Sequence, residues 1–277
     1  RRRKQQPRPQ QRLRRKSKDS VLQLTKRQEA LIRALSSRHG RRGSEFCICD
    51  GLRSSREILH LRPDLVEILI LRDGVGTPEE SPVEPVVLSG PEFERVSRTV
   101  VNSQGIIVVA RRPEMLPPEA PVSGPFALLL DRVGDPGNVG TILRTARAAG
   151  LREVWMTRGC ADPYSDKVVR SASGAQFALA VREYGALEEV VALLRARGIR
   201  RVFRTAPGGG RSVFTEQELF TDSVVVLGSE GAGAGEIPGA VNVLIPMPGD
   251  AESLNVAQAA TVILFEHVRR TCAAAVR

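Results

Sequence analysis

The stretch of residues 223–268 constrains the fold of this chain more than any other part of the sequence. Within it, Val224–Leu227 is a continuous apolar, mostly β-branched run, which is typical of a strand buried on both faces. Val241–Ile245 is a second such run, and we expect Ser253 to open a helix. The apolar residues that share one face of this helix are Val256, Ala260, Ile263, Leu264 and Val268. The loops after both strands and the helix start should therefore meet at one edge of a sheet, where open α/β sheets bind ligands.

A glycine-rich turn, Gly228–Gly235, follows the first of these strands. Because glycine has no side chain, a ligand can approach the backbone of such a turn closely. Two common nucleotide-binding motifs are nevertheless absent. A dinucleotide-binding fingerprint would need a third glycine where Glu236 or Pro238 stands, and the Lys-Ser/Thr pair of a phosphate-binding loop does not follow the turn. Most glycine-rich turns merely punctuate strands, so the turn alone does not identify a ligand.

Length and composition indicate two modest domains with ordinary cores. The chain has 277 residues, and 42% of them are hydrophobic. Cys47 and Cys49 form a single Cys-x-Cys without a second pair, so we expect reduced thiols and no metal site. No apolar run reaches the length of a transmembrane helix. We therefore expect a cytoplasmic protein with no membrane partner.

The excess positive charge of the chain is concentrated at its start. Residues 1–18 contain ten Lys or Arg and no Asp or Glu, and the whole chain also carries +10, so the remainder is neutral. This segment, with Pro7, Pro9 and four glutamines, cannot build a core, and we expect residues 1–19 to be a disordered basic arm. One interpretation is contact with nucleic-acid phosphates. The other is a solubilising or targeting segment, which, as a mitochondrial presequence, would place the protein in an organellar matrix.

Residues 20–111 read as a small α/β unit. A capping box at Thr25–Gln28 opens a helix, Phe46–Cys49 is a short strand, and Gly51–Leu61 is helical. Further expected strands are Val66–Leu71, Val86–Leu88 and Ile106–Ala110. Four arginines of this unit form either an RNA-binding face or ordinary solvated surface: Arg41, Arg42, Arg53 and Arg56. Residues 112–125 are rich in proline and predict a semi-rigid linker at the domain boundary.

A second domain, residues 126–270, begins with the buried strand Phe126–Leu130. After a turn, Asn138 stands where a helix N-cap would, and Arg144 would ordinarily be a solvated residue of that helix. Arg170–Gly174 is either a polar turn or a substrate contact. Periodicity alone predicts an ordinary parallel, doubly wound sheet.

Three short motifs in this domain resemble those of a known family. Gly228-Ser-Glu-Gly231, Ile245-Pro-Met247 and Ser253-Leu-Asn255 resemble motifs two and three of the SpoU/TrmH family of SPOUT RNA ribose 2′-O-methyltransferases, and Asn138–Arg144 is similar to motif one. The resemblance implies an α/β SPOUT domain with a parallel sheet and a deep C-terminal trefoil knot. Phe46–Gly51, followed by a helix, resembles the ribosomal-protein-like substrate-binding domain that precedes the catalytic domain in many of these enzymes.

The same resemblance implies S-adenosylmethionine as the cofactor, bent into the knot with its adenine held by backbone groups. The matching positions are Gly228, Ile245 and Leu254, with Leu227 and Met247 beside them. A sulfonium methyl group is intrinsically activated, so the transfer requires no metal.

The resemblance also implies an active site. Arg144 is either the base that deprotonates the ribose hydroxyl or a group that orients a phosphate and stabilises charge, because guanidinium scarcely deprotonates in proteins. The residues that would position Arg144 and the ribose are Asn138, Glu230, Ser253 and Asn255. In the family the knots pack as a homodimer, and this arginine reaches towards the partner's cofactor.

The sequence therefore predicts an S-adenosylmethionine-dependent enzyme that methylates a ribose 2′-hydroxyl in structured RNA. The extra N-terminal unit favours rRNA over tRNA, although the sequence does not identify the nucleotide. The alternative is a non-catalytic RNA-binding paralogue or assembly factor. A degraded motif would favour that alternative, and every motif residue is present.

Overall fold

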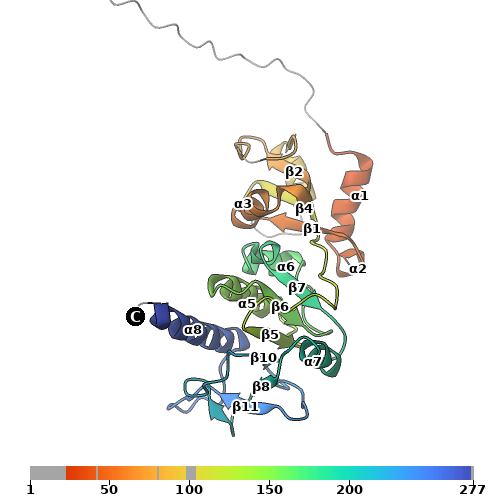
Figure 1. Cartoon of the computed structure of the whole chain (residues 1–277). Helices are drawn as coiled ribbons and strands as arrows, with labels where there is room; N and C mark the ends of the chain where they lie inside the picture. The colour runs from red at the N-terminus through yellow and green to blue at the C-terminus, as the bar shows by residue number, and fades with distance from the viewer. Residues whose placement is uncertain (1–22, 42, 80, 98–103, 276–277) are drawn as a thin grey trace, which may run out of the picture.

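The computed structural model describes residues 23–41, 43–79, 81–97 and 104–275. The expected basic arm, residues 1–19, and Arg42 lie outside this described part. Two sheets stand one above the other, with the N-terminal sheet at the top of Figure 1. Within the described ranges, no helix combines the length and hydropathy that crossing a membrane requires.

The first sheet has four strands in the order β1-β4-β2-β3. Its strand β4 pairs antiparallel with β1 and β2, whereas β2 and β3 are parallel. The bounds are β1 Phe46–Asp50, β2 Val66–Arg72, β3 Val86–Leu88 and β4 Ile106–Arg111, with helices α1 Lys26–Leu35, α2 Arg38–Arg41, α3 Leu52–Leu61 and α4 Gly90–Val96. The predicted capping box of α1 is confirmed, because Gln28 N donates to Thr25 Oγ1 over 3.2 Å and Thr25 N donates to Gln28 Oε1 over 2.9 Å.

The two faces of this sheet are covered differently. Alternate side chains such as Ile48 and Ile70 pack with Ile32 of α1. On the other face, Cys49 and its neighbours pack against α3 and also against side chains from the second half of the chain, namely Tyr164, Val169 and Phe177. One hydrophobic cluster is therefore shared between the two halves of the chain.

The second sheet is the α/β sheet that the sequence predicts, and all its strand pairs are parallel. The strand order is β7-β6-β5-β10-β8-β11-β9. The bounds are β5 Phe126–Asp131, β6 Glu153–Met156, β7 Ala180–Glu183, β8 Arg201–Thr205, β9 Arg211–Ser212, β10 Ser223–Gly228 and β11 Val241–Leu244. Strands β5 and β10 are central and buried at every residue. Our prediction of a second fully buried strand at β11 is wrong: only Val243 is buried there, because β11 has just the two-residue β9 between it and the sheet edge.

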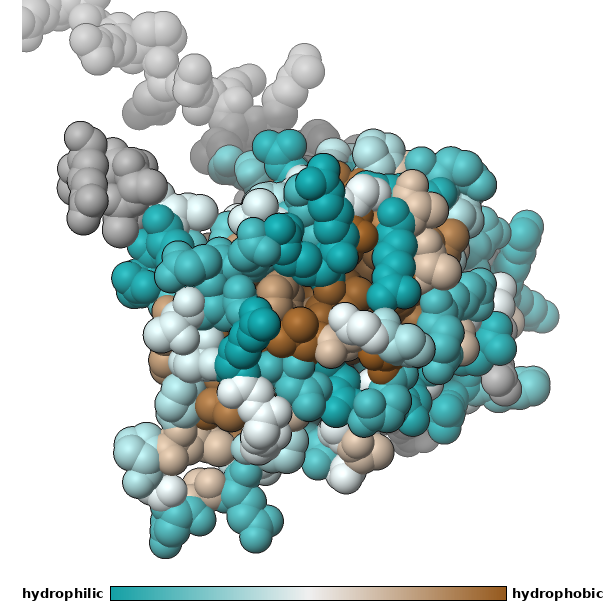
Figure 2. Space-filling view, turned by 60° about the horizontal axis from the view of Figure 1, so that its bottom comes forward, coloured by the Kyte–Doolittle hydropathy of each residue, from teal (hydrophilic) through white to brown (hydrophobic). Residues whose placement is uncertain are grey.

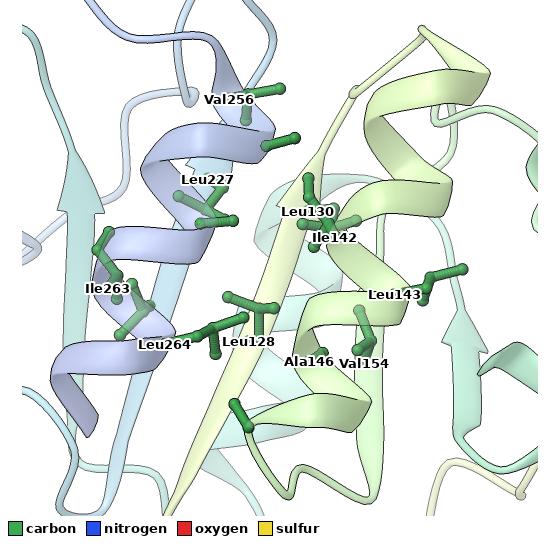
Figure 3. Packing of buried hydrophobic residues seen from close by; sticks show 14 of the residues in the cluster. Leu128, Leu130, Ile142, Leu143, Ala146, Val154, Leu227, Val256, Ile263 and Leu264 are labelled. Carbon is green, nitrogen blue, oxygen red and sulfur yellow. The ribbon is translucent and has the colours of Figure 1, made fainter. Parts of the chain in front are cut away.

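Helices cover both faces of the second sheet. Helices α5, Pro136–Ala148, and α8, Val256–Ala275, lie side by side over β5 and β10, as Figure 3 shows. Leu130, Ile142 and Ile263 belong to the core between them. The opposite face is covered by α7, Leu187–Arg195.

Two helix starts differ from the prediction. Asp135 caps α5, because its Oδ1 accepts a hydrogen bond from Asn138 N over 2.9 Å, so Asn138 lies in the first helical turn and is not the N-cap. Helix α8 begins at Val256, and Ser253 does not open it. Instead Asn255 Oδ1 accepts from Ala257 N over 2.9 Å. In α5 the better-placed acceptor is Asp135, three positions before Asn138. In α8 it is Asn255, two positions after Ser253.

Helix α5 also packs closely on α6, Asp166–Ser171. A Cβ atom on Gly140 would lie 2.8 Å from Ala172 N and would overlap Ser171 Oγ. This contact explains the glycine of the first motif. An ion pair connects α5 to α3, which packs on the first sheet, with Arg147 Nη1 2.5 Å from Glu57 Oε1.

Residues 112–125, the predicted linker, lie along the β7 edge of the second sheet. Arg182 of β7 is fully buried and donates to the carbonyl oxygens of Ala120 and Pro121 over 3.1 and 2.8 Å. Its guanidinium stacks over Trp155, 4.5 Å from the ring centroid, and forms a 3.2 Å ion pair with the buried Glu153. One buried cation thus fixes the linker to the sheet.

We predict that Arg182→Met lowers the free energy of unfolding by about 3–5 kcal/mol, because the carboxylate of Glu153 would remain buried without its cation. The control is Arg152→Met, on an exposed side chain that forms no ion pair with any described residue, and it should change stability by less than about 0.5 kcal/mol. Urea unfolding of the full chain measures both. Equal midpoints for the two variants would contradict this account of the linker.

Candidate functional site

A cavity of about 550 Å³ lies beyond the carboxyl end of β10. Most of its walls come from the end of β10 with its glycine turn, the residues around the end of β11 and the residues that lead into α8, and the end of β8 and Val213 complete it. All five residues predicted to bind the cofactor line it, namely Leu227, Gly228, Ile245, Met247 and Leu254. Figure 2, turned to bring this end of the molecule forward, shows hydrophobic residues gathered at the centre of the face among hydrophilic ones.

The glycine turn folds back over the end of β10. Gly233 N donates to Ser229 O over 2.8 Å, and Gly233 adopts a left-handed φ of 65°. A Cβ atom on Gly228 would overlap the backbone of Gly233 and Ala234. We expected this position to be glycine because the cofactor approaches it. In the structure, the returning chain itself already requires glycine there.

Two charged side chains hold the end of this turn, and we call them and Gly235 the loop clamp. Asp131, at the end of β5 and 1% exposed, accepts a hydrogen bond from Gly235 N over 2.9 Å and another from Thr157 Oγ1 over 3.0 Å. From the other side, Arg204 of β8 donates to Gly235 O over 3.4 Å. Because β5 and β8 flank β10, the clamp fixes the turn from both neighbouring strands.

A polar cluster of three predicted residues lies at the cavity. Glu230 Oε1 accepts a hydrogen bond from Asn138 Nδ2 over 2.8 Å and also one from Asn255 Nδ2. Asn255 Nδ2 is in addition 3.1 Å from Asn138 Oδ1. Asn255 therefore caps α8 with its oxygen and donates to the cluster with its nitrogen. The three motifs, far apart in sequence, converge here.

The other two predicted catalytic residues are placed differently. Ser253 is exposed and lines the cavity. Arg144 is exposed on α5 and does not line the cavity, and its side chain forms no ion pair or hydrogen bond with any described residue. It follows Asn138 by six positions, which turns it about 120° around the helix axis. Within one subunit, the structure thus brings together four of the five predicted catalytic residues and leaves Arg144 apart.

Sequence reasoning missed several residues of the site. Thr205, Ala206, Pro207 and Val213 also line the cavity, and Asp131 and Arg204 clamp its loop. The one available signal was a charged residue directly after the buried strand Phe126–Leu130, since such a residue at a sheet edge often has a functional or structural partner. Nothing in the spacing linked Arg204 or Val213 to the turn.

The chemistry available to the site is limited by its side chains. No group of three His, Cys, Asp or Glu residues within the described ranges could hold a metal ion. Burial raises the pKa of the Cys160 thiol to about 11 and that of Cys49 well above its usual value, so both are neutral thiols near pH 7. A half-apolar cavity with exposed backbone and a carboxylate–amide cluster suits a small organic ligand and a hydroxyl substrate.

Comparison with known proteins agrees with this geometry. The model of the SpoU rRNA Methylase family matches residues 125–265. The 23S rRNA (guanosine(2553)-2'-O)-methyltransferase RlmP of Bacillus subtilis (strain 168) is 34% identical over 212 residues, which are 75% of this chain and 82% of that protein.

Solved structures give the same result over most of the chain. The AdoMet-bound rRNA methyltransferase from Sinorhizobium meliloti superposes with a TM-score of 0.75 and 27% identity, covering 90% of this chain and 97% of that one. The SpoU methyltransferase AviRb from Streptomyces viridochromogenes, in complex with AdoMet, superposes with a TM-score of 0.73 and 25% identity, covering 88% and 98%.

We predict that Gly228→Ala lowers the melting temperature of the full chain, because the added methyl group must displace the returning backbone at Gly233 and Ala234. Strain of this kind typically costs about 1–3 kcal/mol. The matched control is Gly231→Ala in the same turn, where an added Cβ meets no atom within 4 Å. Thermal unfolding without added ligand compares them. If both variants melt with the wild type, the close return over Gly228 is incorrect.

Proposed function

The chain belongs to the SpoU rRNA Methylase family and is an S-adenosylmethionine-dependent RNA ribose 2′-O-methyltransferase, and we propose that a homodimer of it methylates rRNA at composite active sites. The observation that carries the proposal is the convergence of Asn138, Glu230 and Asn255 beside the cavity. A non-catalytic RNA-binding role gives no reason for three polar side chains from separate motifs to meet there.

The cavity fits S-adenosylmethionine. Within the described part of the chain, the backbone N–H and C=O groups of Ile245 and Leu254 form no hydrogen bonds, although both residues line the cavity. Such groups are free to pair with a ligand, and the polar edge of an adenine is a suitable partner. Leu227, Gly228 and Met247 would complete the binding surface. When bound, the cofactor supplies a methyl group on a positively charged sulfur, which is an electrophile without metal assistance.

The chain's own residues would orient the substrate. Glu230 holds the amides of Asn138 and Asn255, so the cluster presents fixed donors and acceptors beside the cavity, where a ribose hydroxyl can bind. Ser253 lies at the same rim. For Arg144 we propose the second of the two roles considered from sequence: its guanidinium orients the phosphate next to the reacting ribose and stabilises developing charge.

Arg144 would perform this role in the partner's site. It lies about 120° around α5 from Asn138, is exposed and has no partner among the described residues. A second subunit related by two-fold symmetry would bring two such arginines to two cavities at once. Phe265, 49% exposed on the outer side of α8, is an apolar residue that such an interface would cover.

The deep trefoil knot is part of the proposal. After β10 the chain passes to β11, on the far side of β8, and then returns so that α8 packs beside α5 over β5 and β10. This return, together with the loop clamp, is what a threaded C-terminus would require. We likewise propose residues 20–111 as the substrate-binding domain and residues 126–270 as the catalytic domain.

We predict that Arg144→Ala binds S-adenosylmethionine with nearly normal affinity and loses about 10²–10⁴ in methyl-transfer rate, because it lacks only a transition-state contact. Leu254→Trp should fail to bind the cofactor, since the larger ring fills the cavity. Calorimetry and transfer of a labelled methyl group to rRNA from a strain lacking the protein measure the two properties. Arg152→Ala, on an exposed arginine outside the motifs that forms no ion pair with any described residue, is the control.

Mixing the two inactive variants tests whether the site is shared. Under subunit exchange, half of the dimers are mixed, and each mixed dimer has one complete site. Activity should therefore recover to roughly a quarter of the wild-type value. Activity that stays at the level of the separate variants would show that Arg144 acts within its own subunit.

A further inference from the structure

Three helices, α3, α6 and α5, follow one another down one side of the molecule and span both sheets (Figure 1). From the arginines on this side we infer an RNA-binding surface, which we call the basic strip: Arg53 and Arg56 on α3, Arg170 on α6 and Arg144 on α5. It binds the phosphate backbone of the substrate RNA, and it presents that RNA to the cofactor of the partner subunit. The inference rests on the function proposed above.

The arginines of the strip differ from many others in the described ranges because few intramolecular contacts hold them. Arg53, Arg56 and Arg144 are exposed and form no ion pair with any described residue. Arg170 makes only a loose ion pair with Asp166, with 3.9 Å between the nearest nitrogen and oxygen. By contrast, Arg182 and Arg204 are largely buried and bound to carboxylates. Of the arginines first considered in the N-terminal unit, Arg41 is likewise committed, to Asp166 over 3.6 Å and to helix α1 carbonyls. Cations left exposed and unpaired are available to a polyanion.

The strip is continuous across the junction between the two halves of the chain. Its centre is the ion pair of Glu57 on α3 with Arg147 on α5. Arg53 lies one helical turn before Glu57, and Arg144 lies about one turn before Arg147, so both flank this contact on the solvent side. Just beyond the end of α6, Gly174 closes the gap, because a Cβ atom there would be 3.0 Å from Glu57 Cβ. Arg170, in the last turn of α6, precedes this glycine by four residues.

The charge balance of the chain supports a local excess of positive charge along the basic strip. Residues 19–277 carry equal numbers of acidic and basic side chains, so four arginines on one side represent a local excess. The nearby carboxylates of Glu57 and Asp166 are already engaged with Arg147 and Arg41. Phosphates, spaced along a strand, match separated guanidinium groups, which bind them bidentately.

Arg144 and the other three arginines of the strip belong to the same subunit. The Glu57–Arg147 pair and the shared hydrophobic cluster hold α3 against α5, so RNA bound on Arg53 and Arg56 is led to Arg144 of that subunit. If Arg144 serves the partner's cavity, one subunit holds the RNA while the other holds the methyl donor. The strip therefore differs from a surface that attracts RNA by positive charge alone, because it delivers the RNA to the cavity of the other subunit.

The first experiment measures RNA binding by the full chain. Arg53→Glu combined with Arg56→Glu should weaken binding of rRNA from a strain lacking the protein by at least roughly tenfold at 0.1 M salt. It should also lower the log–log salt slope by about 1.4–1.8, or 0.7–0.9 for each lost phosphate contact. Cofactor affinity and melting temperature should not change.

The matched control is Arg27→Glu combined with Arg33→Glu on α1, which covers the opposite face of the first sheet. It changes the net charge equally and involves exposed arginines without ion pairs among the described residues. Equal losses of affinity and slope in both double variants would overturn the strip, because only total charge would then matter.

The second experiment tests which subunit the strip serves. The Arg53/Arg56 double variant should recover activity when mixed with Leu254→Trp and should not recover when mixed with Arg144→Ala. Recovery with Arg144→Ala would overturn the inference, because it would place the strip with its own cavity. A third mixture, Arg144→Ala with Leu254→Trp, tests the proposed composite active site separately from the strip. If this mixture fails to recover activity, the proposal of a shared active site is wrong, whatever the strip binds.

Discussion

The structure depends on the tight return of the chain over the end of β10. Gly228 leaves no room for a side chain, and the loop clamp holds the returning turn through opposite charges on β5 and β8. This return shapes one wall of the cavity and places Glu230 where it meets Asn138 and Asn255. A buried carboxylate such as Asp131 is stable only because each of its oxygens is hydrogen-bonded. The site is thus an extension of the packing that closes the sheet.

Charge is used in two ways in this protein. Buried or half-buried arginines hold the architecture together: Arg182 fixes the linker, Arg204 the glycine turn, and Arg270 the segment beside the cavity by donating to Val213 O and Glu216 O. Exposed arginines on α3, α6 and α5 have few intramolecular partners and remain available for RNA. The neutral charge balance beyond the arm therefore conceals a strongly uneven distribution.

Local patterns predicted most of the elements and the parallel sheet, because buried strands and capped helices leave a periodic signal. The ordered motifs further led to all five cavity residues assigned to the cofactor. Contacts between distant segments were not accessible in this way. The caps at Asp135 and Asn255 depend on which of several polar residues is best placed, and the clamp on Gly235 joins residues about a hundred positions apart. Likewise, spacing gave no reason for Arg144 to face away from the cavity of its own subunit.

The central claim is that the Asn138–Glu230–Asn255 cluster orients a ribose for methylation. Mass spectrometry of ribose methylation in rRNA tests it directly, in a strain that lacks the protein and carries either the wild-type gene or Glu230→Ala. The account predicts that a 2′-O-methyl group is lost in the deletion strain, is restored by the wild type, and stays absent with Glu230→Ala although the variant is folded. Full restoration by Glu230→Ala, or an unchanged methylation map in the deletion strain, would contradict it.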